Sequence, residues 1–426
     1  MSDLAFVQKS KIPPSPAPIS EVGVFGWLRQ NLFSSWFNSL LTLLSLYFIF
    51  VILKEFIPWA WGGHWNTKSL RECLDLDPNV ACFSVLTARW KQLLFGLYPA
   101  EEYWRPTVTF VFLVLSIIPI LFPKFFRFFW FSVIYPGLAI WLLWGGSLWN
   151  VGIVYIGFIL GFLIFIFLIK TFLKSTALAG IISIIFTIIF FMFISNFIVT
   201  ILNSIVPISL PPVESLKMGG FTLSLIVGVT GIVASFPIGI LLALGRQSNL
   251  PIIKMICVGF IEFIRGVPLI TLLFVASVLL NYFLPPGTNF DIVLRVIIMV
   301  TLFSAAYMAE VIRGGLAGLP LGQHEASASL GLTYWQSQRL VIMPQALKIS
   351  IPGIVNTFIG LFKDTTLVSI ISLRDPVGLA STIRADQTWN GIYWELYVAI
   401  GLMFFIVCFG MSQYSQYLER KLKTDK

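Results

Sequence analysis

The sequence predicts an all-α, polytopic membrane protein with about ten transmembrane helices. Apolar residue types make up 58% of its 426 residues and charged types only 11%, and the mean hydropathy is +0.91. A soluble fold of this length needs about a quarter of its residues charged to cover its surface. The composition therefore excludes a soluble enzyme, a disordered tail and a disulfide-rich secreted module.

Ten stretches are long and apolar enough to cross a bilayer, which requires about 20 mostly apolar residues. The seventh stretch is interrupted by Glu262, Arg265, Gly266 and Pro268. We therefore expect a short interfacial segment before the true seventh span. The expected spans are 34–53, 106–122, 128–144, 151–169, 178–206, 221–244, 255–284, 292–312, 350–372 and 392–413.

Basic residues end the apolar runs instead of gathering on one face, which argues against nucleic acid as a partner. With the N-terminus in the cytosol, the short outer loops carry only Lys217, Arg374 and Arg384, as the positive-inside rule requires. The long outer loop 54–105 carries more, but long loops translocate largely regardless of charge. Ten spans then place both termini in the cytosol, in a bacterial inner membrane.

The chain divides into four expected segments of different composition. A polar, Pro-rich cytosolic arm (1–33) precedes a five-span extension (34–210) that has almost no intramembrane charge. A five-span core (215–418) follows, in which polar and small residues enter the spans, and a cytosolic tail (419–426) ends the chain. Polar groups cost free energy in hydrocarbon and usually mark function, so we expect the chemistry in the core.

Cysteine and histidine usage is sparse. Cys73 and Cys82 lie in the outer loop, in an oxidising compartment, where a disulfide and two free thiols are about equally expected. The two histidines, His64 and His324, and the scattered cysteines argue against a zinc or iron–sulfur site. We expect no bound metal in this chain.

A cytosolic loop (313–349) between the eighth and ninth spans contains residues that typically begin and end short helices, and their order indicates two of them. Gly331 ends the first, as glycine commonly does. Thr333 can cap the second, 334–342, which Pro344 is expected to close. Two short helices that meet at a glycine form a compact knob, suited to docking into a groove of a cytosolic partner.

The spacing within this loop resembles the EAA motif of ABC importer permeases, which is Glu-Ala-Ala, three residues, Gly, nine residues and Ile-x-Leu-Pro. The spacing is kept in full, with Ser327, Val341 and Met343 as mild departures. Segments 263–270, 305–315 and 361–369 resemble the polar-amino-acid branch, and the long N-terminal extension resembles the general L-amino-acid permeases of that branch. The matching residues are Glu325-Ala326-Ser327, Gly331 and Val341-Ile342-Met343-Pro344.

The resemblance implies a type I ABC importer permease core, whose five helices pair with a second permease around a translocation path. ATPase subunits would grip the loop at Glu325, Ala326, Gly331 and Pro344, and a periplasmic amino-acid-binding protein would deliver the substrate. A P-loop needs a Gly-Lys pair before Ser or Thr, and the chain contains no Gly-Lys dipeptide. We therefore expect no enzyme activity or cofactor in this chain, with ATP and Mg bound by the partner ATPase.

The ninth expected span contains a polar patch, Lys363, Asp364, Thr365 and Thr366. One interpretation is a self-compensating pair near the inner end of the span, with Lys363 reaching to the interface. The interpretation we favour is that the patch faces the path, where Lys363 could attract an α-carboxylate.

Two further charged residues, Arg265 and Glu310, are candidates for the path. Arg265 is three residues from Glu262 and can pair with it, and the helix break that follows is typical of transporter sites. The alternative is an elbow helix on the inner membrane surface. Glu310 and Arg313 are also three apart, and a structural ion pair beside the cytosolic loop is the favoured interpretation for them.

These observations favour ATP-driven import of L-amino acids into the cytosol by alternating access. An ion-gradient-driven secondary transporter would need carboxylates along an intramembrane relay, and the candidates here are few and near helix ends. A channel or an assembly scaffold would not require the glycine-hinged loop. The contrast between the two halves of the chain favours a heterodimeric over a homodimeric permease pair, embedded in membrane lipid.

Overall fold

The computed structural model describes residues 23–171, 176–279, 282 and 291–422. Most of the expected cytosolic arm, the end of the seventh expected span and the last residues of the tail lie outside the described residues. The chain divides into two compact units, Met1–Ser84 and Val85–Lys426, and each is described by itself. The functional boundary expected near residue 210 stays a prediction.

The first unit contains one long apolar helix and a small disulfide-linked loop. The hydroxyl of Ser35 caps the long helix by accepting the Asn38 N–H at 3.2 Å. This helix continues past the expected end at residue 53 because apolar residues resume after Lys54 and Glu55 and Gly62 forms its C-cap. The helices are α1 (Gly23–Asn31), α2 (Trp36–Trp61) and α3 (Leu70–Leu76).

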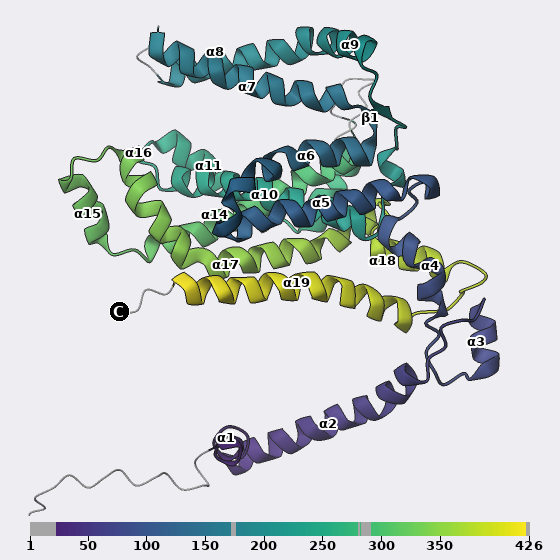
Figure 1. Ribbon diagram of the computed structural model, residues 1–426. Helices are drawn as coiled ribbons and strands as arrows, with labels where there is room; N and C mark the ends of the chain where they lie inside the picture. Colours follow the sequence, from purple (N-terminus) through teal and green to yellow (C-terminus); the bar gives the residue numbers. More distant parts are fainter. Residues whose placement is uncertain (1–22, 172–175, 280–281, 283–290, 423–426) are drawn as a thin grey trace, which may run out of the picture. The chain divides into compact units, whose positions relative to one another are not determined.

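The second unit begins with helices that form two hairpins, α5 with α6 and α7 with α8 and α9 (Figure 1). In the second hairpin the helices approach closely at Gly161, where a Cβ would lie 2.2 Å from the Thr187 Oγ1. The Ser183 hydroxyl donates to the Gly161 carbonyl at 2.7 Å. The elements are α4 (Ser84–Phe95), η1 (Ala100–Glu102), α5 (Trp104–Leu121), η2 (Pro123–Phe128), α6 (Phe129–Trp144), α7 (Leu148–Thr171), α8 (Thr176–Ile189), the π-helical turn η3 (Phe190–Ile194) and α9 (Ser195–Ile205).

The segment between these hairpins and the core is held by specific contacts. Strand β1 (Gly146–Ser147) pairs antiparallel with β2 (Ser209–Leu210). The indole N–H of Trp144 donates to the Ser215 hydroxyl at 2.7 Å, at the short 3₁₀ helix η4 (Ser215–Lys217). The connection is therefore an ordered part of this unit.

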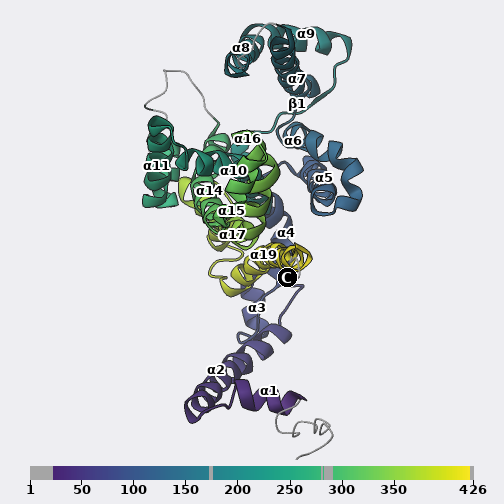
Figure 2. The same ribbon diagram turned by 90° about the vertical axis from the view of Figure 1, so that its left-hand side faces the viewer.

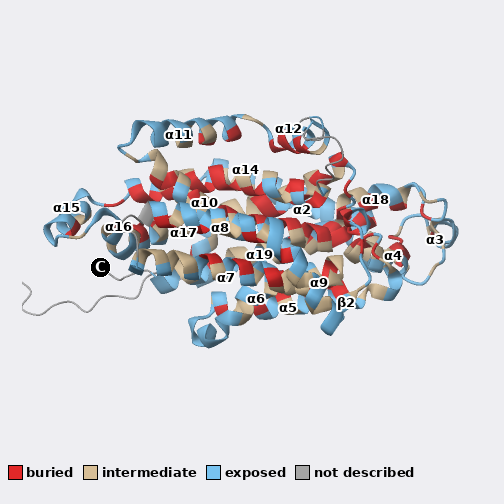
Figure 3. Cartoon of the chain, turned by 90° about the horizontal axis from the view of Figure 1, so that it is seen from above, coloured by how far each residue is buried: buried red, intermediate tan, exposed pale blue. Residues whose placement is uncertain are grey.

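The core is a bundle in which α10, α14 and α17 pack together and α19 packs on α17 (Figure 2). Helix α14 is buried along much of its length, whereas the outer face of α11 is exposed (Figure 3). The elements are α10 (Gly220–Arg246), α11 (Pro251–Gly266), α12 (Leu269–Phe274), the π-helical turn η5 (Val275–Leu279), α14 (Ile292–Ala317), α15 (Leu321–Ser329), α16 (Tyr334–Ser337), the π-helical turn η6 (Gln338–Ile342), α17 (Met343–Asp364), η7 (Thr365–Ile371), α18 (Pro376–Arg384) and α19 (Trp394–Leu422).

The span count agrees with the sequence. Among the described residues, nine helices are long and apolar enough to cross a membrane, or ten if a bent pair counts as one span. The bent pair is α11 with α12 and η5, which meet at 100° around Pro268. The expected interruption of the seventh span is thus confirmed.

One local prediction is wrong. The second short helix of the loop 313–349 does not close at Pro344, because α16 continues through η6 directly into α17. Pro344 occupies the first turn of α17. A proline is tolerated there because its missing N–H has no helical partner to lose, and the wider turn of η6 lies immediately before it.

Candidate coupling loop and charge cluster

The loop 313–349 turns at a residue that only glycine suits. Gly331 has φ +71°, the left-handed region, and no atom lies within 4 Å of the position that its Cβ would occupy. The turn therefore requires glycine for its backbone conformation and not for space. Beyond it, Thr333 and Gln336 form a capping box that starts α16.

Ser327 joins the two short helices. Its side chain is buried, and its hydroxyl donates to the His324 carbonyl at 2.8 Å and lies 2.7 Å from the Ser337 hydroxyl of α16. The Gln345 side-chain amide of α17 donates to the Gln323 amide oxygen at 3.0 Å. Ser327, which in the sequence is only a departure from the EAA pattern, thus stabilises the knob.

The outer surface of the knob is exposed and partly apolar. Glu325, Ala326, Gly331 and Pro344 are all exposed. The knob projects from the end of the core at which α19 ends (Figures 1 and 2). Five large apolar side chains of the knob are exposed. On this knob they are Leu321, Leu330, Tyr334, Trp335 and Leu340.

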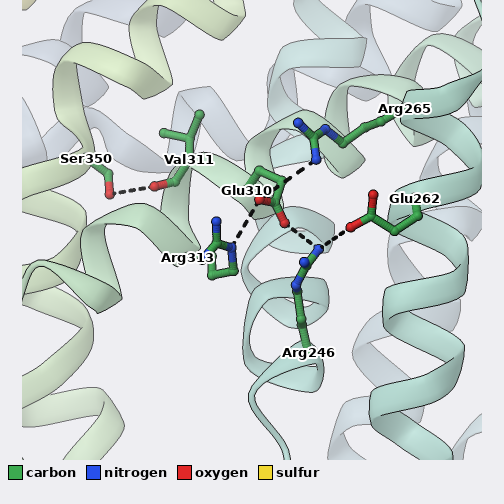
Figure 4. A network of polar contacts seen from close by, with 7 residues as sticks. All are labelled: Arg246, Glu262, Arg265, Glu310, Val311, Arg313 and Ser350. Carbon is green, nitrogen blue, oxygen red and sulfur yellow. Dashed lines mark hydrogen bonds and ion pairs between the residues drawn. The ribbon is translucent and has the colours of Figure 1, made fainter.

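A cluster of charged residues lies where α10 ends, beside the start of the loop (Figure 4). The Glu310 carboxylate of α14 accepts from Arg246 at 2.6 Å and from Arg313 at 3.0 Å, and lies 3.8 Å from Arg265. Arg246 also pairs with Glu262 at 2.9 Å. The expected pair of Glu310 with Arg313 is present, whereas Glu262 and Arg265 each pair with another helix.

Glu310 is the centre of this cluster. Its side chain is only 16% exposed, against 54% for Glu262, and it contacts three guanidinium groups. Removing one partner of a buried ion pair leaves an uncompensated charge, which is strongly destabilising. Glu310 therefore fixes the ends of α10 and α11 to α14.

Helices α14 and α17 are also in close contact beside this cluster. The Ser350 hydroxyl of α17 donates to the Val311 carbonyl of α14 at 3.2 Å (Figure 4). At Gly315 a Cβ would lie 2.0 Å from the Ser350 Oγ. The helix that enters the knob and the helix that leaves it are thus packed backbone to side chain at the base of the loop.

The structure separates the two groups of candidate path residues. Arg265 and Glu310 lie at the loop end of the core, whereas Lys363 and Asp364 lie at the opposite end of α17, 20 residues beyond Met343. That distance is about 30 Å along a helix. One of the two interpretations placed Lys363 and Asp364 near the inner end of the span. The structure places them at the end of α17 that is away from the loop 313–349, and which end is the inner one stays a prediction.

The four polar residues of this patch differ in exposure. Lys363 is exposed, and Asp364 and Thr366 are half-buried. Thr365 is fully buried, and its hydroxyl donates to the Phe362 carbonyl at 2.7 Å. Thr365 therefore packs within the bundle, and the other three residues are the ones that an open path could reach.

Sequence reasoning missed Asp375, which caps α18. The carboxylate accepts the N–H groups of Gly378 at 2.9 Å and Val377 at 3.2 Å. Its burial raises its pKa to about 6, in spite of these two hydrogen bonds. The Asp-Pro pair at the start of a helix was the available signal.

The two cysteines of the outer loop form a disulfide, which is one of the two states that the sequence left open. Cys73 of α3 is joined to Cys82, nine residues later. The other two cysteines, Cys257 and Cys408, are free and partly buried.

Comparison with known proteins places the chain among transport proteins. Residues 235–424 match the family of binding-protein-dependent transport system inner membrane components. A glutamate/glutamine/aspartate/asparagine transport system permease protein, BztC of Rhodobacter capsulatus, is 52% identical over the full length of both chains. The inner membrane amino-acid ABC transporter permease protein YhdY of Escherichia coli is 38% identical over 97% of each chain.

A solved structure is also similar. A chain in the crystal structure of an amino acid ABC transporter with histidines is 31% identical in sequence to this chain, with a TM-score of 0.42. The match covers 47% of this chain and 90% of that chain. The sequence relatives are ABC permeases and not ion-gradient-driven transporters. The chain therefore belongs to the family of binding-protein-dependent inner membrane components and is an amino-acid permease subunit of an ABC importer, a multi-pass protein that works with a separate ATPase and a binding protein.

Proposed function

We propose that this permease takes up amino acids with acidic or amide side chains, namely glutamate, glutamine, aspartate and asparagine. The observation that carries the proposal is the 52% identity to the Rhodobacter capsulatus permease for these four substrates, which extends over the whole of both chains. The match covers the N-terminal spans as well as the core, which supports a shared architecture for the two proteins.

In this proposal the knob is the contact with the ATPase. Glu325, Ala326 and Gly331 lie at its exposed surface, and Pro344 at its base. The exposed apolar side chains around them would be covered in the complex, which supports docking. ATP and Mg would bind to the ATPase, and this chain would contribute no nucleotide site and no cofactor.

The charge cluster would transmit movement of the knob. Helix α14 runs directly into the loop, and Glu310 on its last turns contacts Arg246 of α10 and Arg265 of α11. A displacement of the knob would therefore shift the inner ends of three helices together. We assign Glu310 and Arg265 this positioning role at the inner end of the path.

The exposed Lys363 and the half-buried Asp364 and Thr366 are proposed to line the path at its outer part, with Thr365 as a packing residue beneath them. A lysine in such a place would attract the α-carboxylate that all amino acids carry. We further propose a second, different permease as the partner and both termini in the cytosol. The end of α19 lies at the same end of the core as the knob (Figure 1), which supports this orientation for the C-terminus.

The direct test is uptake by the purified complex in proteoliposomes. ATP with Mg, supplied on the side of the vesicle membrane that carries the ATPase, should drive uptake of labelled glutamate. An ionophore that collapses ion gradients should not stop this uptake. Unlabelled glutamine, aspartate and asparagine should compete, whereas arginine and leucine should not. Uptake that fails without an ion gradient although ATP is present would contradict the transport mechanism, and competition by arginine alone would contradict the substrate class.

Purification in a mild detergent with mass spectrometry of the bound subunits tests the partners. We expect an ATPase with a P-loop and a second permease. Recovery of this permease alone with the ATPase would contradict the heterodimer.

A further inference from the structure

An apolar cavity of about 620 Å³ lies where the α5–α6 hairpin turns. This volume falls within the range of ligand pockets, roughly 300–1,000 Å³. The lining is apolar throughout, and most of it is aromatic. The lining residues are Leu115, Ile118, Pro119, Phe122, Phe125, Phe128, Trp130 and Phe131.

Two cations lie in the 3₁₀ helix that contributes to the lining of this cavity. Lys124 and Arg127 lie in η2, between lining residues of the cavity, and both are exposed. Helix α19 also contacts this turn, because the Tyr414 hydroxyl donates to the Leu121 carbonyl at 2.7 Å, and the end of α19 carries Arg420 and Lys421 beside Glu419. Among the ion pairs of the described residues, none involves Lys124 or Arg127.

We infer that this cavity binds an anionic phospholipid, with one acyl chain among the aromatic side chains and the phosphate between Lys124 and Arg127. The lining offers hydrocarbon contacts and no polar group to orient a peptide or a sugar, so the cavity suits an alkyl chain. Its position at the end of two spanning helices places it at the depth where an acyl chain meets its headgroup. The paired cations complement a phosphate, and basic pockets between membrane helices favour anionic lipids.

The experiment is a lipid titration of the purified importer complex, followed by native mass spectrometry. The two probes are phosphatidylglycerol and phosphatidylcholine with identical acyl chains. We expect tighter binding of the first phosphatidylglycerol molecule. Each basic residue at such a surface corresponds to roughly fivefold in binding, so the Lys124→Gln/Arg127→Gln variant should bind it about thirtyfold more weakly and lose the preference.

Matched variants separate a built cavity from general attraction to a basic protein. Lys170→Gln/Lys254→Gln removes two exposed charges that lie elsewhere and should keep the preference. Ile118→Trp fills the cavity and should weaken binding of both lipids, whereas Ile120→Trp, on an exposed residue outside the lining, should not.

Three results would overturn the inference. The first is an equal loss of preference in the Lys170→Gln/Lys254→Gln control. The second is full competition by glycerol phosphate, which has no acyl chain and would show a site for free phosphate. The third is a protein adduct in place of a lipid adduct when a photoactivatable phenylalanine analogue replaces Phe128, which would show that another subunit covers the cavity.

Discussion

Helices α7 and α14 are both long enough to span the membrane, yet they are built for different surroundings. In the most apolar stretch of α14, 56% of the residues are buried, against 17% in α7. Helix α7 buries Ile153 and, against its hairpin partner, Gly157 and Gly161, whereas its other residues are half-buried or exposed. Helix α14 is covered by α10, α11 and α17 and ends in the charge cluster around Glu310.

This difference shows what a membrane helix needs for each role. Without a hydrophobic driving force between helices in lipid, small residues that permit close approach are enough to hold a hairpin together. A helix that must transmit movement needs directional contacts as well, and ion pairs provide them. We therefore assign lipid-facing packing to the hairpin α7–α8 and transport to the core.

The largest effect is expected for Glu310→Gln. The change leaves three guanidinium groups without their shared carboxylate, and the loss should uncouple α14 from α10 and α11. We expect uptake to fall between tenfold and a hundredfold while the protein is still inserted, measured as uptake per complex in proteoliposomes. Glu262→Gln is the control, because it removes a largely exposed partner of Arg246 worth at most about 1 kcal/mol, and its uptake should fall less than threefold. Equal losses in both variants would contradict the central role of Glu310.

A smaller effect is expected for Gly331→Ala in the knob. Alanine at a positive φ costs roughly 1–2 kcal/mol, so the turn should distort and uptake and ATPase binding should each fall about fivefold. Gly322→Ala is a matched control, because Gly322 also has open space for a Cβ but no positive φ. Pull-down of the ATPase with each variant checks this, and weaker binding by Gly322→Ala than by Gly331→Ala would contradict the assignment.

Gly161→Leu tests the packing role assigned to the hairpin α7–α8. The new side chain would clash with Thr187, and overpacking of this kind costs typically 1–3 kcal/mol. We expect a lower melting temperature in detergent with unchanged uptake per folded complex. Gly152→Leu, where the nearest atom is 3.8 Å away, should change neither. Loss of uptake by folded Gly161→Leu complexes would show that this hairpin takes part in transport.

The smallest effect is expected for Asp375→Asn. The pKa of Asp375 is raised from 3.8 to about 6, so the folded protein favours the neutral form. This stabilisation is complete below pH 4 and is lost as the pH rises through 6. Asparagine keeps one acceptor, for the Gly378 N–H, and loses the second, for the Val377 N–H. Because it carries no charge, the variant should still melt roughly 2–4 °C higher than the wild type at pH 7.5 and at about the same temperature at pH 4. A variant that melts lower at pH 7.5 would contradict the shift.

The sequence predicted the fold class and most of the spans, because apolar length is a local property that a bilayer enforces. The glycine turn at Gly331, the cap at Thr333 and the break before Pro268 were likewise predicted, since each depends on the chemistry of one or two residues. Pairings between helices could not be predicted in the same way. Residues three apart suggested that Arg265 pairs with Glu262, but tertiary packing brought it to Glu310 instead.

The position of the polar patch along α17 could also not be predicted from the sequence. Its depth depends on where α17 begins, and the π-helical turn η6 lets that helix start before Pro344. Sequence patterns do not reveal such a turn, because five residues are too few to establish a periodicity of their own. The burial of Ser327 was not predicted for a related reason, since the sequence around a serine in a loop does not indicate that it contacts Ser337.

We propose that the core, through Glu310, couples ATP hydrolysis in the partner subunits to amino-acid import. The most direct test measures ATP hydrolysis and uptake in the same proteoliposomes for the wild type, Glu310→Gln and Gly161→Leu. We expect Glu310→Gln to hydrolyse ATP with at least tenfold less amino acid imported per ATP, whereas Gly161→Leu should keep the wild-type ratio. A wild-type ratio in Glu310→Gln together with a reduced ratio in Gly161→Leu would contradict it.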